Sequence, residues 1–284
     1  MNRDGEDTTS PMDDHVVDFV RQHLRSDDQP TVLLDVGCRS GRLLLRLQRE
    51  FDPKSEGTIQ LFGLDVSDSG VQLEESFLPV TEHRLDEQFP EVHWRDRLIS
   101  IESEDPWPYA DATFDIIISN QVLEHVTDQA AFLIQHSRTL KPGGVGLHLS
   151  PLKEVIMEWH VGVPLVDRFS DAVGYRTARA WSAVIPTARL APRGRLAGES
   201  TATFARRSCD MVEDATSYIS ERGLRKAAEA SGLTIAFSGT TALYANRFRL
   251  IVRPAGPTCR LRFMRDRPLR FCQLRNASPA CPSF

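Results

Sequence analysis

Apolar runs alternate with amphipathic stretches along most of this chain, and this alternation predicts strands joined by helices. The expected strands occupy residues 31–36, 59–65, 98–102, 114–119, 144–149, 233–239 and 247–254. The expected helices occupy residues 15–25, 41–50, part of 68–95, 128–140 and 217–232. The first strand is apolar along almost its whole length, which is typical of the buried central strand of a parallel sheet. The pattern therefore predicts an α/β fold.

The regular pattern breaks after Pro151. Residues 151–213 contain helical stretches, four prolines and no clear strand, so we expect a mostly helical insert there. Residues 1–12 are polar and are expected to be disordered. Residues 255–284 are expected to form a basic tail. The predicted organisation is one domain over residues 13–254 that the insert interrupts.

The most informative segment is the turn that joins the first strand to its helix. Residues 31–47 read TVLLDVGCRSGRLLLRL. Gly37 and Gly41 allow a tight turn and the close approach of a ligand, because a Cβ atom would be in the way. The helix that follows directs unpaired backbone N–H groups toward the loop. Proteins of the α/β class hold nucleoside-containing cofactors in this way; the alternative is a tight turn without a ligand.

The glycine spacing separates two cofactor classes. The loop does not fit the dinucleotide fingerprint G-x-G-x-x-G, which disfavours a nicotinamide-dependent oxidoreductase. Instead DVGCRSG resembles the first motif of class I S-adenosylmethionine-dependent methyltransferases, D-x-G-C-G-x-G. Arg39 stands where that motif has its middle glycine. Its side chain is expected to point away from the cofactor.

Asp65 ends the second expected strand, roughly 20–25 positions past the glycine turn. An acid at that position can accept hydrogen bonds from two ribose hydroxyls. The alternative is that Asp65 and Ser67 cap the next helix. Within the resemblance, Asp65 is implied to bind the ribose.

A longer resemblance to the same family covers residues 98–126, LISIESEDPWPYADATFDIIISNQVLEHV. The family pattern is an acidic patch, L-P-F-x-D-x-x-F-D, an apolar strand and x-L-E-H-V. The corresponding residues are Trp107, Pro108, Tyr109, Asp111, Phe114, Asp115, Leu123, Glu124 and His125. Residues 136–151 resemble the helix, L-K-P-G-G turn and fifth strand that follow in the family.

The resemblance implies a fold and a site. The fold is a Rossmann-like, doubly wound, seven-stranded sheet whose last strand runs antiparallel. The implied cofactor is S-adenosylmethionine, and its binding residues are Asp35, Gly37, Cys38, Gly41, Asp65, Val66, Glu102, Ser103, Glu104 and Asn120. The acidic stretch 102–104 would read the adenine, with an ambiguity of one residue. Asn120 and His125 would lie at the methyl-transfer face as candidate catalytic residues.

Two features of the insert favour a role in acceptor binding. Residues 158–165, EWHVGVPL, are similar to a segment of methyltransferase-domain proteins from bacterial surface-polysaccharide clusters. Its His160 is a candidate catalytic base, since a histidine can take up a proton near neutral pH; a histidine packed in a cap is the alternative. Residues 176–207 hold seven arginines and one acid, which suits a phosphate or carboxylate. A solvated basic surface is the alternative reading of these arginines.

Composition narrows the class of protein. The net charge of −5 argues against non-specific nucleic-acid binding. No apolar run is long enough for a transmembrane helix, and the chain does not begin with a secretory signal. Five cysteines without a C-x-x-C pair fit a reduced cytoplasmic protein and disfavour disulfides or a metal site. The basic tail, with its interleaved apolar residues, could contact a membrane surface weakly.

The sequence therefore predicts a cytoplasmic methyltransferase that uses S-adenosylmethionine. Its acceptor would be a small molecule, a sugar or a lipid-linked compound, and the arginines of the insert favour an anionic one. Because the sulfonium methyl group is already activated, the protein has mainly to align a nucleophile and exclude water. A non-catalytic cofactor-binding scaffold with the same fold is the alternative, since a fold does not determine a function.

Overall fold

The computed structural model describes residues 11–54, 56–67, 78–153, 157–158, 163–164, 200, 203, 216–239 and 270–276. Seven strands within these ranges form one sheet in the order β3-β2-β1-β4-β5-β9-β8. The strands are β1 (Thr31–Val36), β2 (Ile59–Val66), β3 (Leu98–Ile101), β4 (Phe114–Asn120), β5 (Leu140–Leu149), β8 (Leu233–Gly239) and β9 (Arg270–Asn276). β1 to β5 pair in parallel, whereas β9 runs antiparallel to both β5 and β8.

The order of the strands makes the sheet doubly wound. The chain moves outward from β1 through β2 to β3, and then returns to the other side of β1 with β4 and β5. Val36, Leu64 and Ser119 are neighbours across the three central strands, so the carboxyl ends of these strands meet at one edge. We call this edge the carboxyl edge. In open α/β sheets, a ligand binds where the winding direction reverses.

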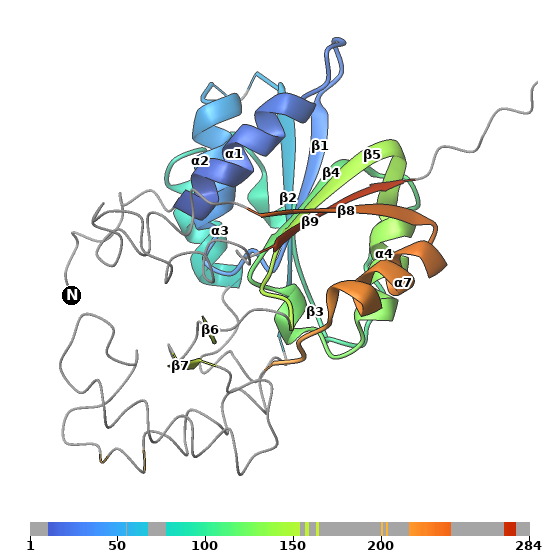
Figure 1. Ribbon diagram of the computed structural model, residues 1–284. Coiled ribbons are helices and arrows are strands. Elements are labelled where there is room, and N and C mark those ends of the chain that lie inside the picture. The colour runs from blue at the N-terminus through green and yellow to red at the C-terminus, as the bar shows by residue number, and fades with distance from the viewer. Residues whose placement is uncertain are drawn as a thin grey trace, which may run out of the picture.

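Helices cover both faces of the sheet (Figure 1). α1 (Pro11–His23), α2 (Arg42–Phe51) and α3 (Leu78–Asp86) lie on one face, and α4 (Gln129–Thr139) and α7 (Glu221–Ala230) lie on the other. Two short 3₁₀ helices are also present: η2 (Trp94–Asp96) precedes β3, and η3 (Leu123–His125) follows β4. Within the ranges given above, no helix combines the length and the apolar character that a bilayer-spanning segment needs.

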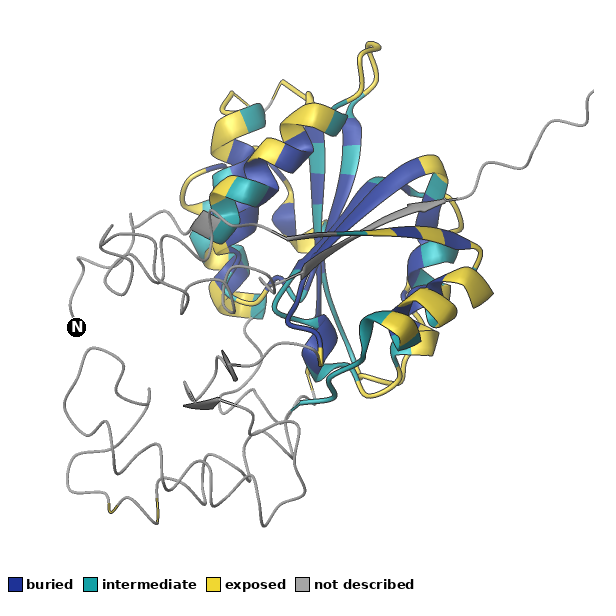
Figure 2. Cartoon of the chain, in the orientation of Figure 1, coloured by how far each residue is buried: buried dark blue, intermediate teal, exposed yellow. Residues whose placement is uncertain are grey.

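Amphipathic spacing explains why these segments become helices that pack on the sheet. In α2 the buried residues Leu43, Leu44 and Leu47 face the strands, while the arginines of the same helix lie toward solvent. Figure 2 shows the result, with a buried sheet between helices whose outer faces are exposed. Two helices also have side-chain caps: Asp128 accepts a hydrogen bond from Ala131 N–H, and Ser220 accepts one from Gly223 N–H.

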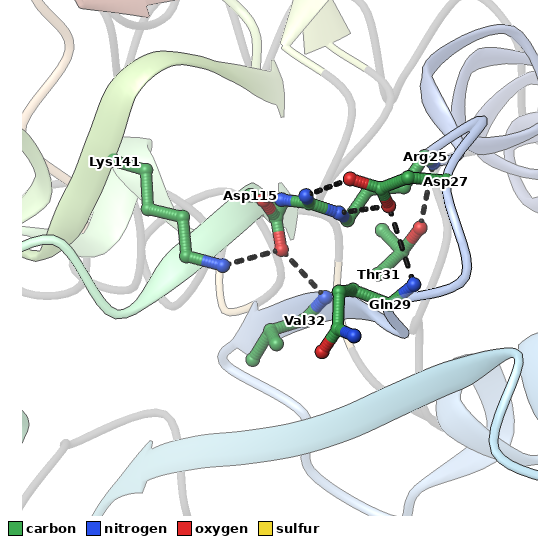
Figure 3. Close-up of polar contacts among 7 residues, drawn as sticks. All are labelled: Arg25, Asp27, Gln29, Thr31, Val32, Asp115 and Lys141. Atoms are coloured by element: carbon green, nitrogen blue, oxygen red, sulfur yellow. Dashed lines mark hydrogen bonds and ion pairs between the residues drawn. The ribbon is translucent and has the colours of Figure 1, made fainter.

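A polar cluster around Asp115 joins β1 and β4 at the opposite edge of the sheet, which we call the amino edge (Figure 3). Asp115 Oδ2 accepts hydrogen bonds from Val32 N–H at 2.9 Å and from Lys141 Nζ at 2.8 Å. Arg25 Nη1 lies 3.1 Å from the other carboxylate oxygen, and Arg25 also pairs with Asp27. Asp115 of the F-D pair and Lys141 of the L-K-P-G-G turn therefore connect the beginnings of β1, β4 and β5.

The strand that lies between β5 and β8 comes from a different part of the chain than expected. Residues 247–254, which we expect to be a strand, lie outside the described residues. The strand that fills the place between β5 and β8 is β9, and it comes from the segment expected to be a basic tail. β5 requires a partner for the backbone N–H and C=O groups on its open side.

Smaller differences concern the insert and the ends of elements. In the insert, β6 (Met157–Glu158) and β7 (Val163–Pro164) form a short antiparallel pair where we expect helix, and most of the insert lies outside the described ranges. β5 begins at Leu140 rather than at residue 144, with a register shift opposite Phe114. α1 begins at Pro11, within the segment expected to be disordered, because proline suits the first helical position.

Candidate active site

The glycine loop between β1 and α2 alternates into the left-handed region of backbone space. Gly37, Arg39 and Gly41 have φ angles of 76°, 43° and 69°. Arg39 thus adopts the conformation that glycine favours, although a Cβ atom makes it strained there. Its side chain is exposed, as expected. The loop therefore keeps the backbone of a G-x-G-x-G turn without its middle glycine.

Two elements hold this loop from outside. Asp65 of β2 accepts a hydrogen bond from Arg39 N–H at 2.6 Å and another from Val66 N–H at 2.8 Å. From α3, Thr81 Oγ1 donates to Arg39 O, and Arg84 Nη1 donates to Ser40 O at 3.0 Å. The carboxylate of Asp65 therefore orders the loop.

Two carboxyl groups lie side by side at the carboxyl edge. Asp35 of β1 is 2% exposed and Asp65 is 9% exposed. Burial raises the pKa of Asp35 well above its usual range, and the charges of Asp65 and of Asp13 on α1 add to this effect. A cation at this edge would relieve the repulsion between these groups.

Cys38, which the resemblance counts among the cofactor-binding residues, has a buried side chain. Its thiol is 5% exposed and packs under the loop, where a Cβ atom on Gly63 would lie 2.8 Å from Cys38 Sγ. Burial and the charges of Asp35 and Asp65 raise the pKa of the Cys38 thiol well above its usual value, so it is not a nucleophile. Its N–H is also used, because it donates to Leu64 O at 3.3 Å. Cys38 is therefore a packing residue.

The start of α2 remains suited to an anionic or polar ligand group. Gly41 is the N-cap residue and supplies no side-chain acceptor for the first turn of the helix. Space around the loop is limited: a Cβ atom on Gly37 would lie 2.3 Å from Val122 Cγ2, and one on Gly41 would lie 2.6 Å from Thr81 Cγ2. Val122 and Thr81 thus shape the loop, although no sequence motif marked either residue for this role.

The end of β4 contributes a polar atom without a protein partner. Asn120 Oδ1 is buried and has no hydrogen-bond partner among the described residues. Gln121 follows with a left-handed φ of 58°, and both its N–H (2.7 Å) and its Nε2 (3.2 Å) donate to Leu149 O. Strained backbone and unsatisfied polar atoms concentrate at functional sites. Asn120 is therefore the residue of β4 best placed to contact a ligand.

The turn η3 comes directly after these residues. His125 is half-buried at its end, and its N–H donates to Val122 O at 2.8 Å. Glu124 is 1% exposed and accepts a hydrogen bond from Ser150 Oγ at 2.7 Å. From the sequence, Glu124 was identified only as a residue that matches the family pattern. No local sequence pattern predicted that its carboxyl group would be buried.

The acidic stretch lies in the loop after β3, whose end is adjacent to the end of β2 through the pair Val66 and Ile101. Glu102, Ser103 and Glu104 are all exposed, and Asp105 closes the turn by accepting a hydrogen bond from Glu102 N–H at 3.1 Å. The structure therefore brings this stretch to the same edge as Asp65. His160 and the arginines of residues 176–207 lie outside the described residues.

A buried histidine pair lies behind the carboxyl edge, between the sheet and α4. His148 Nδ1 and Ser119 Oγ are 2.7 Å apart, and the rings of His136 and His148 lie 4.9 Å apart, centroid to centroid. Both histidines are fully buried. Burial lowers the pKa of His148 to about 3, and burial together with His148 lowers the pKa of His136 well below its usual value. These rings are neutral at physiological pH.

The architecture defines a class: an α/β protein with a doubly wound sheet and a glycine turn at the point where the winding reverses. The family can now be stated. The model of the family described as "Methyltransferase domain" matches residues 12–236, and the chain belongs to this family. The resemblance to class I S-adenosylmethionine-dependent methyltransferases is thereby confirmed.

Curated relatives of this chain are also named as methyltransferases. The chain is 25% identical over 174 residues to the mitochondrial ubiquinone biosynthesis O-methyltransferase of Homo sapiens, an alignment that covers 57% of this chain and 42% of the relative. It is 26% identical over 141 residues to the 27-O-demethylrifamycin SV methyltransferase of Amycolatopsis mediterranei, covering 49% and 43%. The chain thus spans less than half the length of these relatives.

Two solved structures support the fold. A geranyl diphosphate methyltransferase in complex with SAM superposes with a TM-score of 0.51 at 14% identity, covering 92% of this chain and 83% of that one. The CMeT domain of the citrinin polyketide synthase gives 0.52 at 14% identity, covering 94% and 53%. At such low identity, these structures show only that the sheet and its helices follow the same plan.

Proposed function

We propose that this chain transfers the methyl group of S-adenosylmethionine to a small-molecule, sugar or lipid-linked acceptor. The observation that carries the proposal is the glycine loop, whose three left-handed residues lie beside the buried carboxyl groups of Asp35 and Asp65. S-Adenosylmethionine has a sulfonium, an ammonium and a ribose, and acids at a strand edge can complement all three.

The residues present fit this cofactor. The left-handed turns at Gly37 and Gly41 would shape the loop around its methionine part, and Asp35 would meet its ammonium group directly or through water. Each carboxylate oxygen of Asp65 can accept more than one hydrogen bond, so ribose hydroxyls can bind beside the N–H groups of Arg39 and Val66. Glu102, Ser103 or Glu104 would read the adenine amino group, and Asn120 Oδ1 would find a partner in the cofactor or the acceptor.

The chemistry asked of the protein is modest. When bound, the cofactor supplies an activated methyl group. The loop and the carboxyl edge orient that group, and the surrounding residues exclude water from it. An imidazole nitrogen of His125 or of His160 would take the proton from the acceptor as its nucleophilic atom reacts. Replacing each histidine by alanine distinguishes them. Loss of the residue that acts as the base should lower the transfer rate about 10²–10⁴-fold and leave cofactor affinity intact.

The relatives favour an oxygen nucleophile on a small molecule. The human relative is named for O-methylation in ubiquinone biosynthesis, and the Amycolatopsis relative for methylation of 27-O-demethylrifamycin SV. We further propose that the insert at 151–213 forms the acceptor side of the site. Its arginines, including Arg176 and Arg179, would bind an anionic group of the acceptor. Neutralising both should then raise the KM for the acceptor more than it lowers kcat.

The test combines binding and turnover on the full chain. Calorimetry with S-adenosylhomocysteine should show binding, and the same experiment with NADH should show none. Methyl-labelled S-adenosylmethionine is then incubated with phenolic, sugar and lipid-linked acceptors, and transfer of label to one class is expected. Binding of S-adenosylhomocysteine without transfer to any acceptor class would favour the cofactor-binding scaffold instead. Failure to bind S-adenosylhomocysteine would overturn the proposal.

A further inference from the structure

Three segments that are distant in the sequence meet at η3. The chain leaves β5 through residues 150–153 and returns through residues 216–219, and we call these two pieces together the stem of segment 154–215. Glu124 Oε2 accepts a hydrogen bond from Ser150 Oγ at 2.7 Å. The backbone carbonyl of Glu124 accepts another from Ser217 N–H at 2.6 Å. A single residue of η3 therefore binds both halves of the stem.

Further hydrogen bonds fasten the two halves of the stem to each other and to η3. Lys153 N–H donates to Ile219 O at 3.0 Å. Gln129 Nε2, at the start of α4, donates to Ser217 O and also to Leu123 O at 3.3 Å. The two halves of the stem are thus held together at one place, next to the half-buried His125.

The chemical nature of Glu124 suggests more than a structural tie. Its side chain is 1% exposed and that of its partner Ser150 is 6% exposed. A carboxylate loses much more hydration free energy on burial than an amide or a hydroxyl, either of which could accept the same hydrogen bond. A carboxyl group at this depth, beside the end of β4, is sensitive to the polarity of its surroundings.

Hydrogen bonds also connect the stem with the carboxyl edge. Gln121, which follows Asn120, donates twice to Leu149 O, and Leu149 immediately precedes Ser150. These bonds join the end of β4 to the end of β5. From there the contact of Ser150 with Glu124 leads to Ser217.

We propose that Glu124 is a positioning residue that couples ligand occupancy at the end of β4 to the stem of segment 154–215. The inference deepens the proposed function and rests on it, because the segment so positioned would hold the methyl acceptor. Packed contacts alone do not demonstrate coupling, so the proposal has to be tested as a change at one site that depends on a ligand at the other.

Hydrogen exchange with S-adenosylhomocysteine as the probe provides that test. In the wild type, the ligand should slow exchange at least tenfold in peptides that contain the Ser217 amide. In Glu124→Ala, S-adenosylhomocysteine should still bind with an affinity within threefold of the wild type, and exchange at Ser217 should no longer respond to it. Glu124→Gln keeps an oxygen that can accept from Ser150 and should restore the response in part.

Asp52→Asn is the matched control. Asp52 is also a buried carboxyl group, 4% exposed, and accepts hydrogen bonds from Glu56 N–H and Gly57 N–H near the amino edge. This variant should keep the full response at Ser217, which separates the effect of Glu124 from a general loss of stability. A response lost equally in Asp52→Asn would overturn the proposal.

The remaining outcomes are also decisive. If Glu124→Ala does not fold, Ser150→Ala takes its place, because it removes only the hydroxyl that donates to Glu124 and should lose the same response. Binding of S-adenosylhomocysteine with unchanged exchange at Ser217 in the wild type overturns the coupling alone, as does a response that persists in Glu124→Ala. No binding to the wild type overturns the proposed function together with this inference.

Discussion

The two edges of the sheet use polar residues in opposite ways. At the amino edge, Asp115 accepts hydrogen bonds from Val32, Lys141 and Arg25, so its charge is compensated by cations and its oxygens are used (Figure 3). At the carboxyl edge, Asp35 is buried with a raised pKa and Asn120 Oδ1 has no partner among the described residues. The first arrangement stabilises the fold without a ligand, whereas the second has the buried polar groups and perturbed pKa that are common at functional sites.

Backbone strain follows the same division. Of the described residues other than glycine, three have positive φ, and two of them, Arg39 and Gln121, lie at the carboxyl edge. Strain of this kind persists only where the surrounding structure imposes it, and it is common at functional sites. The comparison predicts that changes at the amino edge will act on stability, while changes at the carboxyl edge will act on binding.

The largest expected effect is that of acid on the buried histidines behind the carboxyl edge. His136 and His148 have lowered pKa values in the folded protein, so the unfolded chain binds more protons below its pKa of about 6.5. Stability should therefore be full above about pH 6.5 and should fall as the pH decreases toward 3. Between pH 6.5 and 5 each histidine should remove about 2 kcal/mol. Urea unfolding across this range measures the slope.

His136→Leu tests the origin of that slope. Both ring nitrogens of His136 are buried and have no hydrogen-bond partner among the described residues, so leucine removes a titrating group without breaking a bond described here. The acid-dependent loss should decrease by about half in this variant. An unchanged slope would assign the acid sensitivity to other groups.

The next largest effect is expected at the amino edge. Asp115→Ala removes the acceptor of Val32 N–H and leaves Lys141 and Arg25 uncompensated. It should lower the free energy of unfolding by about 2–3 kcal/mol, as measured by urea unfolding, without changing the affinity for S-adenosylhomocysteine. Asp111→Ala is the control from the same motif. Asp111 pairs with Arg138 but is 77% exposed, so less than about 1 kcal/mol should be lost.

Asp65→Ala should act mainly on binding. The change removes the acceptor of Arg39 N–H, which orders the glycine loop, together with the proposed ribose contact. Affinity for S-adenosylhomocysteine should fall by about 1–3 kcal/mol in calorimetry. Asp52→Ala is matched to it, since it also deletes a buried carboxyl group that accepts two backbone N–H bonds. Equal losses of affinity in the two variants would remove the distinction between the edges.

Arg39→Gly should have the smallest effect. Glycine adopts a φ of 43° without strain, so stability should rise by no more than about 1 kcal/mol. Affinity for S-adenosylhomocysteine should be unchanged or higher, because the exposed Arg39 side chain points away from the cofactor in our interpretation. Arg39→Ala deletes the same side chain but keeps the Cβ atom and the strain. A loss of affinity above tenfold in both variants would show that the guanidinium group contacts a ligand.

Local patterns in the sequence were sufficient for most of the scaffold. The strands at 31–36 and 233–239 have the predicted bounds, and those at 59–66, 98–101 and 114–120 differ by one residue at one end. These segments are strongly apolar and bounded by turns, so hydrophobic burial alone selects their conformation. β9 was missed because residues 270–276 become a strand only when the open sides of β5 and β8 are available to pair with them.

The features of the site likewise fall into those that local sequence patterns predict and those that depend on contacts between distant residues. The sequence by itself determined the glycine turn and the gathering of strand-end acids, because each depends on local backbone geometry or on the parallel direction of the strands. The tertiary structure alone decided that Asp65 binds the loop and that Glu124 joins the stem. Those roles depend on which residues distant in the chain become neighbours and how far water is excluded from them, and no local pattern encodes either quantity.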